Sequence, residues 1–117
     1  MKSISIISIP VTDQQAAKEF YLKLGFKLIV EAPFDTHKWI QMALPRQESV
    51  SITLVTWFPN MPAGSVNGFV ITTDNLDKEI EELTAKGISV GKVDQTPWGR
   101  FAAVTDPDGN RMSLHQH

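Results

Sequence analysis

The sequence contains no cysteine and no long apolar run. Without Cys among its 117 residues the protein cannot form disulfides, thiolate metal ligands or a thiol nucleophile, and this composition is compatible with a reducing compartment. Its apolar stretches fall well short of the roughly 20 residues that a membrane-spanning helix needs. The first residues, Met1-Lys2-Ser3-Ile4, lack the positive and apolar regions of a secretory signal. We therefore expect a cytoplasmic protein with no membrane partner.

An excess of charge of either sign is also missing. The protein has 11 Lys and Arg against 13 Asp and Glu, a formal net charge of −2 at pH 7, and no basic stripe along any expected element. Nucleic acid is therefore not an expected partner, because its recognition relies on clustered positive charge. The sequence also lacks a phosphate-binding glycine loop, a serine nucleophile elbow and a metalloprotease helix motif. None of these absences excludes a small-molecule ligand.

What the sequence does contain is one pattern used twice. An alternating apolar run ends in Thr12-Asp13 and is followed by an amphipathic helix and Gly25; the same order recurs with Thr73-Asp74 and Gly87. A polypeptide of this length builds one core rather than two independent ones. The repeat therefore predicts one domain made of two similar halves, with a shared cleft between them.

Each half predicts a strand, a helix and three further strands. Asp13 is the expected cap of the first helix and Thr73-Asp74 of the second, and Asp106-Pro107-Asp108-Gly109-Asn110 has strong turn chemistry. We expect a first module at 1–58, a linker at 59–65 and a second module at 66–117. The expected elements are strands at 4–11, 26–31, 38–44, 50–57 and 66–72, strands beginning at 88, 100 and 111, and helices at 14–24 and 76–86.

Three segments together resemble the vicinal oxygen chelate superfamily, which includes glyoxalases, fosfomycin-modifying enzymes, extradiol dioxygenases and bleomycin-resistance proteins. They are the strand ending in Thr12-Asp13, the stretch Phe20-Tyr21-Leu22-Lys23-Leu24-Gly25-Phe26, and the Asp106–Asn110 turn. The resemblance covers essentially the whole sequence. It implies an α+β fold of two βαβββ modules related by a pseudo-twofold axis, with curved sheets around a pocket, in a homodimer.

In enzymatic members of that superfamily four side chains, usually His, Glu or Gln, hold a divalent metal. The corresponding positions here are Ile6, Asn67, Ser113, and either Ser51 or Thr53. Isoleucine cannot ligate, and amides and hydroxyls are poor ligands for transition metals. We therefore expect neither a metal nor another cofactor. A shifted site involving His115, which shares a strand face with Ser113, is the alternative.

The segment Pro97-Trp98-Gly99-Arg100 is more similar to metal-free bleomycin-resistance proteins than to glyoxalases. Arg100 is expected to orient an anionic or carbonyl group, unless it pairs with a surface carboxylate, and Trp98 to stack on a ligand, unless it fills the core or a dimer contact. Phe34 and His37 fall in a segment without clear period, where the superfamily often has a loop over the cleft. The residues expected to line the pocket are Ile6, Ser8, Trp39, Thr53, Asn67, Trp98, Arg100, Ser113 and His115.

Three functions are consistent with these residues. The first is a metal-independent protein that binds or sequesters a small hydrophobic or aromatic molecule such as an antibiotic. The second is a divergent lyase or dioxygenase with a shifted metal. The third is a dimeric interaction module without a small ligand. Similarity of fold does not decide among them, because one fold supports many activities.

Overall fold

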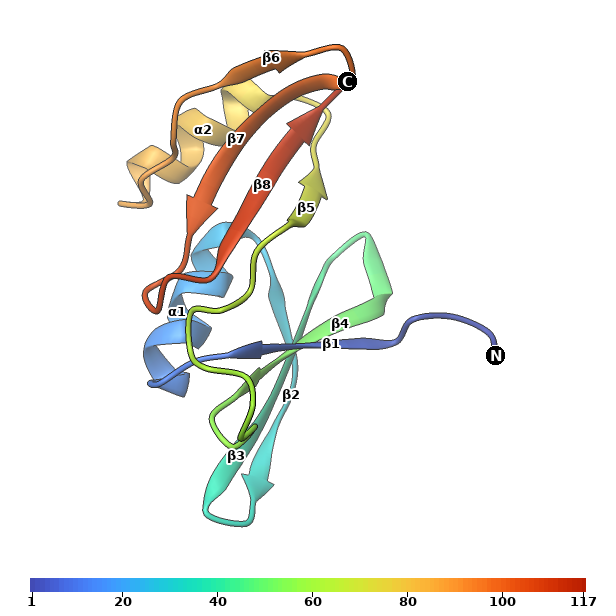
Figure 1. Cartoon of the computed structure of the whole chain (residues 1–117), viewed down its shortest axis with the longest axis vertical. Helices are drawn as coiled ribbons and strands as arrows, with labels where there is room; N and C mark the ends of the chain where they lie inside the picture. The colour runs from blue at the N-terminus through green and yellow to red at the C-terminus, as the bar shows by residue number, and fades with distance from the viewer.

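The computed structural model describes residues 1–117, which form two sheets and two helices in the repeated order that the sequence predicts (Figure 1). The elements are β1 (Ile6–Pro10), α1 (Gln14–Leu24), β2 (Lys27–Phe34), β3 (His37–Leu44), β4 (Gln47–Val55), β5 (Phe69–Thr72), α2 (Leu76–Ala85), β6 (Asp94–Thr96), β7 (Gly99–Thr105) and β8 (Arg111–Gln116). Neither helix is both long enough and apolar enough to cross a bilayer.

The two sheets have the same strand order. The first runs β1-β4-β3-β2 and the second β5-β8-β7-β6. In each, the first strand pairs in parallel with the last, and the remaining pairs are antiparallel. This is the α+β fold of two βαβββ modules that the sequence predicts. Figure 1 shows the second sheet above the first, with α1 beside the turn that joins β7 to β8.

The helix ends follow local capping chemistry. Asp13 caps α1, its carboxylate accepting hydrogen bonds from the backbone N–H groups of Gln15 (3.0 Å) and Ala16 (3.1 Å). The expected cap of α2 was wrong: Asn75 performs this role, accepting from the N–H of Lys78 at 3.1 Å. Asp74 is instead exposed and pairs with Arg46. Thr, Asp and Asn are all good N-cap residues, so a run of three such residues does not specify which of them caps the helix.

Most expected strands have bounds that differ from those of the structure, and two of the differences change the path of the backbone. β2 continues to Phe34 and turns tightly into β3 through Asp35 and Thr36, so the segment expected to form a loop is a hairpin. Asp35 adopts a positive φ of 55°, which aspartate tolerates better than most residues. The strand expected to begin at 88 is reduced to a single bridge between Val90 and Val104, and β6 lies further on.

The core joins the two modules. It includes Ile9, Leu54 and Tyr21 from the first and Leu76 and Leu114 from the second, all almost fully buried. α1 packs on β2, β3 and β4, and α2 packs on β8. Each helix therefore covers one side of its sheet. We call the side turned away from the helix the far face of that sheet.

Candidate ligand-binding site

The far face of the first sheet carries a row of polar side chains. Because alternate residues of a strand point to opposite sides, the residues between the core positions of β1, β3 and β4 lie on this face. The hydroxyls of Ser8 and Thr53 share a hydrogen bond of 3.2 Å, and the Gln41 amide donates to the hydroxyl of Ser51 at 3.1 Å. Thr53 is only 1% exposed, so it forms the floor of this face rather than its rim.

An aromatic cluster adjoins this row. The ring centroid of Phe34 lies 5.9 Å from that of Trp39 and 5.1 Å from that of Trp57, and the His37 and Trp57 rings are 5.2 Å apart. The Trp39 indole also donates to Gln41 at 3.1 Å. Phe34 remains 44% exposed. Of these rings, the sequence predicted only Trp39 in the site. The alternation Phe34, His37, Trp39 across the hairpin is the signal that would have identified Phe34 and His37, whereas Trp57 lies after β4 and joins them only in the folded structure.

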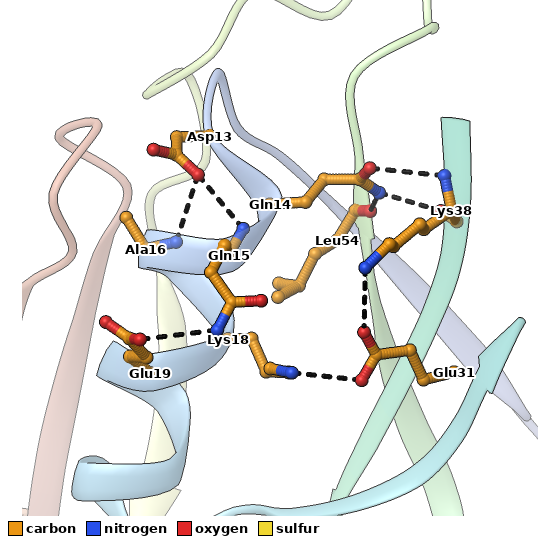
Figure 2. Close-up of polar contacts among 9 residues, drawn as sticks. All are labelled: Asp13, Gln14, Gln15, Ala16, Lys18, Glu19, Glu31, Lys38 and Leu54. Carbon is orange, nitrogen blue, oxygen red and sulfur yellow. Dashed lines mark hydrogen bonds and ion pairs between the residues drawn. The ribbon is translucent and has the colours of Figure 1, made fainter. Parts of the chain in front are cut away.

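Gln14 holds β3 and β4 together where their pairing stops. The register between these strands ends at Gln41 and Thr53. Beyond it, the Gln14 amide donates to the carbonyl oxygens of Lys38 (2.7 Å) and Leu54 (2.8 Å) and accepts from the Lys38 N–H at 3.2 Å (Figure 2). One glutamine therefore replaces missing strand-to-strand hydrogen bonds, next to Trp39. Sequence analysis did not identify this role.

Charged side chains also join α1 to the hairpin. Glu31 on β2 accepts from Lys18 at 3.0 Å and from Lys38 at 3.3 Å, as Figure 2 shows. The hydrogen bond from Lys18, then that from Lys38, lowers the pKa of the Glu31 carboxyl. These contacts lie on the helix side of the sheet, so they support the hairpin without occupying its far face.

The far face of the second sheet carries Ser113 and His115. The His115 ring is stacked on Phe101, with centroids 4.5 Å apart and planes at 26°. His115 Nε2 lies 2.9 Å from the carbonyl oxygen of Trp98 and must donate, because a carbonyl only accepts. In the neutral ring this leaves Nδ1 as the acceptor. Trp98 itself, in the turn between β6 and β7, has 73% of its surface exposed.

Gly99 permits this close approach. Its φ is +121°, and a Cβ placed there would lie 2.4 Å from the carbonyl oxygen of Gln116 and 2.9 Å from His115 Nε2. A larger residue would therefore displace β8 or break the contact between His115 and Trp98. The glycine thus keeps the Trp98 carbonyl within hydrogen-bond reach of the histidine.

Arg100 lies on the helix side of the second sheet, not on the far face where the sequence placed it. It is paired across the sheet with Gln116, whereas Phe101 is paired with His115, so alternation separates Arg100 from His115. The guanidinium donates to both carboxylate oxygens of Asp77 on α2, at 2.7 and 3.2 Å. This hydrogen bonding lowers the pKa of Asp77 and raises that of Arg100. The arrangement matches the alternative of pairing with a surface carboxylate.

The structure groups the remaining expected residues in two sets. Ile6, Ser8, Trp39 and Thr53 share the far face of the first sheet; Ser113 and His115 share that of the second, with Trp98 at its end. Asn67 is exposed and precedes β5 rather than lying in it. The sheets are separate, and extensive strand packing occurs only within each sheet.

Two hollows of the protein are lined by residues outside both sets, and the second also includes His37 of the aromatic cluster. One of about 600 Å³ opens between α1 and residues 86–91, and one of about 580 Å³ adjoins the start of α1. Neither is lined by any of the nine residues expected to bind a ligand. A single protomer therefore holds the two candidate sets on different sheets, and neither of these two hollows joins them.

The residues at the superfamily's metal-ligand positions do not fit a divalent transition metal. Ile6 has no donor atom, and the hydroxyls of Ser51 and Thr53 take part in hydrogen bonds with their neighbours. No group of three or more His, Cys, Asp or Glu side chains gathers anywhere in the structure. Such a metal site needs about three of these donors, so we derive no chemistry through a metal.

Comparison with known proteins decides the family. Residues 3–114 match the family model described as Glyoxalase/Bleomycin resistance protein/Dioxygenase superfamily. The chain belongs to this superfamily. Within it, the protein is 31% identical to the Bacillus subtilis (strain 168) protein YwkD, an alignment that covers 99% of this chain and 98% of YwkD. The resemblance inferred from the sequence is confirmed.

Solved structures of the superfamily superpose closely on this protein. TnmS3, described as an antibiotic binding protein from Streptomyces sp. CB03234, has 39% identity and a TM-score of 0.93, covering 99% of this chain and 96% of its own. A glyoxalase/bleomycin resistance protein from the same organism has 41% identity and a TM-score of 0.85, covering 97% of this chain and 100% of its own. Both sheets and both helices are thus shared with these relatives.

Proposed function

We propose that this superfamily member binds a small hydrophobic or aromatic molecule, such as an antibiotic, without a metal ion. The observation that carries the proposal is the partly exposed aromatic cluster of Phe34, His37, Trp39 and Trp57, beside a polar row on a sheet face that no helix covers. The antibiotic binding described for TnmS3, with 39% identity to this chain, supports the same proposal.

Aromatic rings next to satisfied polar groups suit a ligand with a flat apolar body and a few hydrogen-bonding groups. Stacking or edge contacts with Trp and Phe stabilise such a body, and polar side chains at the floor fix its orientation. The side chains of this row are uncharged, and their polar groups bond in two pairs, Ser8 with Thr53 and Gln41 with Ser51. The site thus favours an uncharged or delocalised ring system over a compact anion.

A second copy of the protein would complete the site. One protomer keeps its two sets of residues on separate sheets, so we propose a homodimer in which the far face of one protomer's first sheet meets that of its partner's second sheet. Trp98 and His115 would then approach a ligand held against Trp39. Arg100 is left out of this proposal, because Asp77 occupies its guanidinium on the helix side.

Tryptophan fluorescence titration with bleomycin and with an anthracycline tests ligand binding. Trp39→Leu and Trp98→Ala should each weaken binding of the responding drug by about tenfold, equivalent to about 1.4 kcal/mol. The control is Leu22→Ala, an exposed apolar residue on α1, which should change affinity by less than about twofold. No response to either drug, or an equal loss in all three variants, would contradict the proposal.

Sedimentation equilibrium across a range of concentrations tests the dimer separately. A dimer that binds ligand in proportion to its population supports the two-copy site. Binding by a monomer at full affinity would keep the proposed ligand but reject the shared cleft. The two outcomes therefore test the proposed ligand binding and the proposed dimer independently.

A further inference from the structure

The four asparagines of the protein differ in burial and in the hydrogen bonds that their side chains make. Asn110 is fully buried, and its amide donates to Asp106 and to the carbonyl oxygen of Pro10, each at 2.8 Å. Asn75 caps α2 through its side-chain oxygen. Asn60 is exposed in the turn after β4, and Asn67 is exposed before β5. Only Asn110 and Asn75 have side chains committed to hydrogen bonds.

The side-chain amide of Asn67 and the backbone N–H of the next residue, Gly68, both lack a hydrogen-bond partner within the protein. No side-chain hydrogen bond includes Asn67, and the N–H of Gly68, which lies outside every strand, donates no backbone hydrogen bond. A Cβ built on Gly68 would meet nothing within 4 Å, so the space beside its α-carbon is open. Glycine also has no Cβ to hinder attack by its own nitrogen. An asparagine in this setting is thermolabile.

We infer that Asn67-Gly68 is a site of spontaneous deamidation. The backbone nitrogen of Gly68, after losing its proton to hydroxide or buffer base, attacks the amide carbon of the Asn67 side group. A new bond between these two atoms closes a five-membered succinimide. The bond from the same carbon to the Asn67 amide nitrogen breaks, and that nitrogen takes a proton from water or the protonated buffer and leaves as ammonia. Water then opens the ring at either carbonyl, which yields aspartate or isoaspartate. No oxidant, enzyme or metal takes part.

The same chemistry is blocked at the buried or capping asparagines by their neighbours. The N–H that would attack Asn75 belongs to Leu76 and donates to the Gln116 amide oxygen at 2.7 Å. The N–H that would attack Asn110 belongs to Arg111 and donates to the carbonyl oxygen of Val66 at 2.9 Å. Asn60 is exposed but is followed by Met61, whose bulk crowds the attacking nitrogen. The expected order of rates is therefore Asn67 first, then Asn60, with Asn75 and Asn110 slowest.

The modified protein should stay folded. Val66 is held by Asn110 and Arg111, and Phe69 is paired with Met112, so an added backbone carbon at position 67 falls in the short exposed stretch between two fixed points. Aspartate or isoaspartate adds one negative charge to a protein whose formal net charge is −2. The charge appears next to β5, at the edge of the second sheet, whether or not a ligand binds there.

Peptide mapping by mass spectrometry tests this inference on the folded full-length protein. After incubation at about pH 8 and about 37 °C, the Asn67 peptide should gain about 1 Da and become a substrate for isoaspartyl methyltransferase labelling. Asn67→Gln is the matched control, because the larger ring that glutamine must close forms far more slowly; its labelling should fall to background while its far-ultraviolet circular dichroism is unchanged.

The outcomes are distinct. Conversion of Asn67 at least about tenfold faster than of Asn75 and Asn110 in the same sample, slowing at about pH 6, supports the inference, because deprotonating the Gly68 amide requires base. Conversion of Asn67 no faster than of Asn60, or equal labelling of the Asn67→Gln variant, would overturn it. Neither result depends on a ligand, so the test is independent of the proposed binding function.

Discussion

The Tyr21 hydroxyl donates a 2.9 Å hydrogen bond to Asp106 Oδ2 and so joins the first helix to the last turn of the protein. Tyr21 has no exposed surface and Asp106 only 4%. Asp106 also accepts from the backbone N–H groups of Asp108 and Asn110, each at 2.9 Å. The turn thus supplies donors to its own carboxylate, and Tyr21 links that network to the other module. This contact joins the two modules, together with the shared core and the bond from Asn110 to the Pro10 carbonyl.

Tyr21→Phe is expected to destabilise the fold by about 1.5–3 kcal/mol, because it removes a buried hydrogen bond to a charged acceptor without opening a cavity. Urea denaturation measures the loss. Thr12→Val is the matched control: its hydroxyl also reaches the turn, donating to Asp108 at 2.6 Å, but at an exposed position, and should cost less than about 1 kcal/mol. Equal losses in the two variants would show that burial of the Tyr21 contact adds nothing.

Alkaline pH should destabilise the protein through the same residue. Burial, and then the negative charge of Asp106, raises the pKa of Tyr21 above its ordinary value of 10.0. The folded state therefore holds the phenol proton more tightly than the unfolded state. The free energy of unfolding should be steady below the unfolded pKa and fall as pH rises above it. Because Tyr21 is the only tyrosine, tyrosinate absorbance reports it alone. The Tyr21→Phe variant should lose this part of the pH dependence, and an unchanged slope would contradict the assignment.

Gln14→Ala should loosen the hairpin that carries the aromatic cluster. The substitution removes three hydrogen bonds to backbone groups of Lys38 and Leu54, and we expect a loss of about 1–3 kcal/mol. Faster hydrogen exchange at the Lys38 amide and a weaker near-ultraviolet circular dichroism signal from tryptophan should accompany it. Gln15→Ala, which removes only an exposed contact with Glu19, is the control and should stay within about 0.5 kcal/mol. A normal Lys38 exchange rate in Gln14→Ala would rule out the bridging role.

Arg100→Gln should act on acid stability rather than on ligand affinity. Arg100 lowers the pKa of Asp77 below its ordinary 3.8, so the pair stabilises the fold above that pH and the effect is lost as pH falls through the folded-state value. The variant should raise the Asp77 pKa towards 3.8, as measured by carboxyl chemical shifts during an acid titration. Its drug affinity should change by less than about twofold. A tenfold loss of drug affinity with an unchanged Asp77 pKa would indicate that Arg100 contacts the ligand instead.

Patterns of neighbouring residues were sufficient to predict much of this fold. The helix at 14–24 and its Asp13 cap are confirmed residue for residue, because spacing of apolar positions and capping chemistry depend only on nearby residues. The repeat of strand, helix and strands also followed from such patterns. Local patterns did not identify Asn75 as the cap of α2, because it is one of three adjacent residues that can each cap a helix. They also did not extend the strand to Phe34, because Pro33 and Asp35 are poor strand residues, whereas pairing with β3 continues the strand to that point.

Long-range pairing decided the parts of the candidate site that local patterns left open. Which face of β7 bears Arg100 depends on its register with β8 and on Asp77 of α2, a contact between residues 23 positions apart. Gln14 bridges β3 and β4 beyond the point where their backbone pairing ends. The segments that carry the superfamily resemblance can be recognised from local sequence, even though two of their residues, Tyr21 and Asp106, bond to each other only in the folded protein. Where a side chain lies relative to a distant strand is set by packing of the whole molecule. The amino-acid pattern therefore predicted the family and the two modules, and the tertiary structure alone placed the candidate residues on two separate sheet faces.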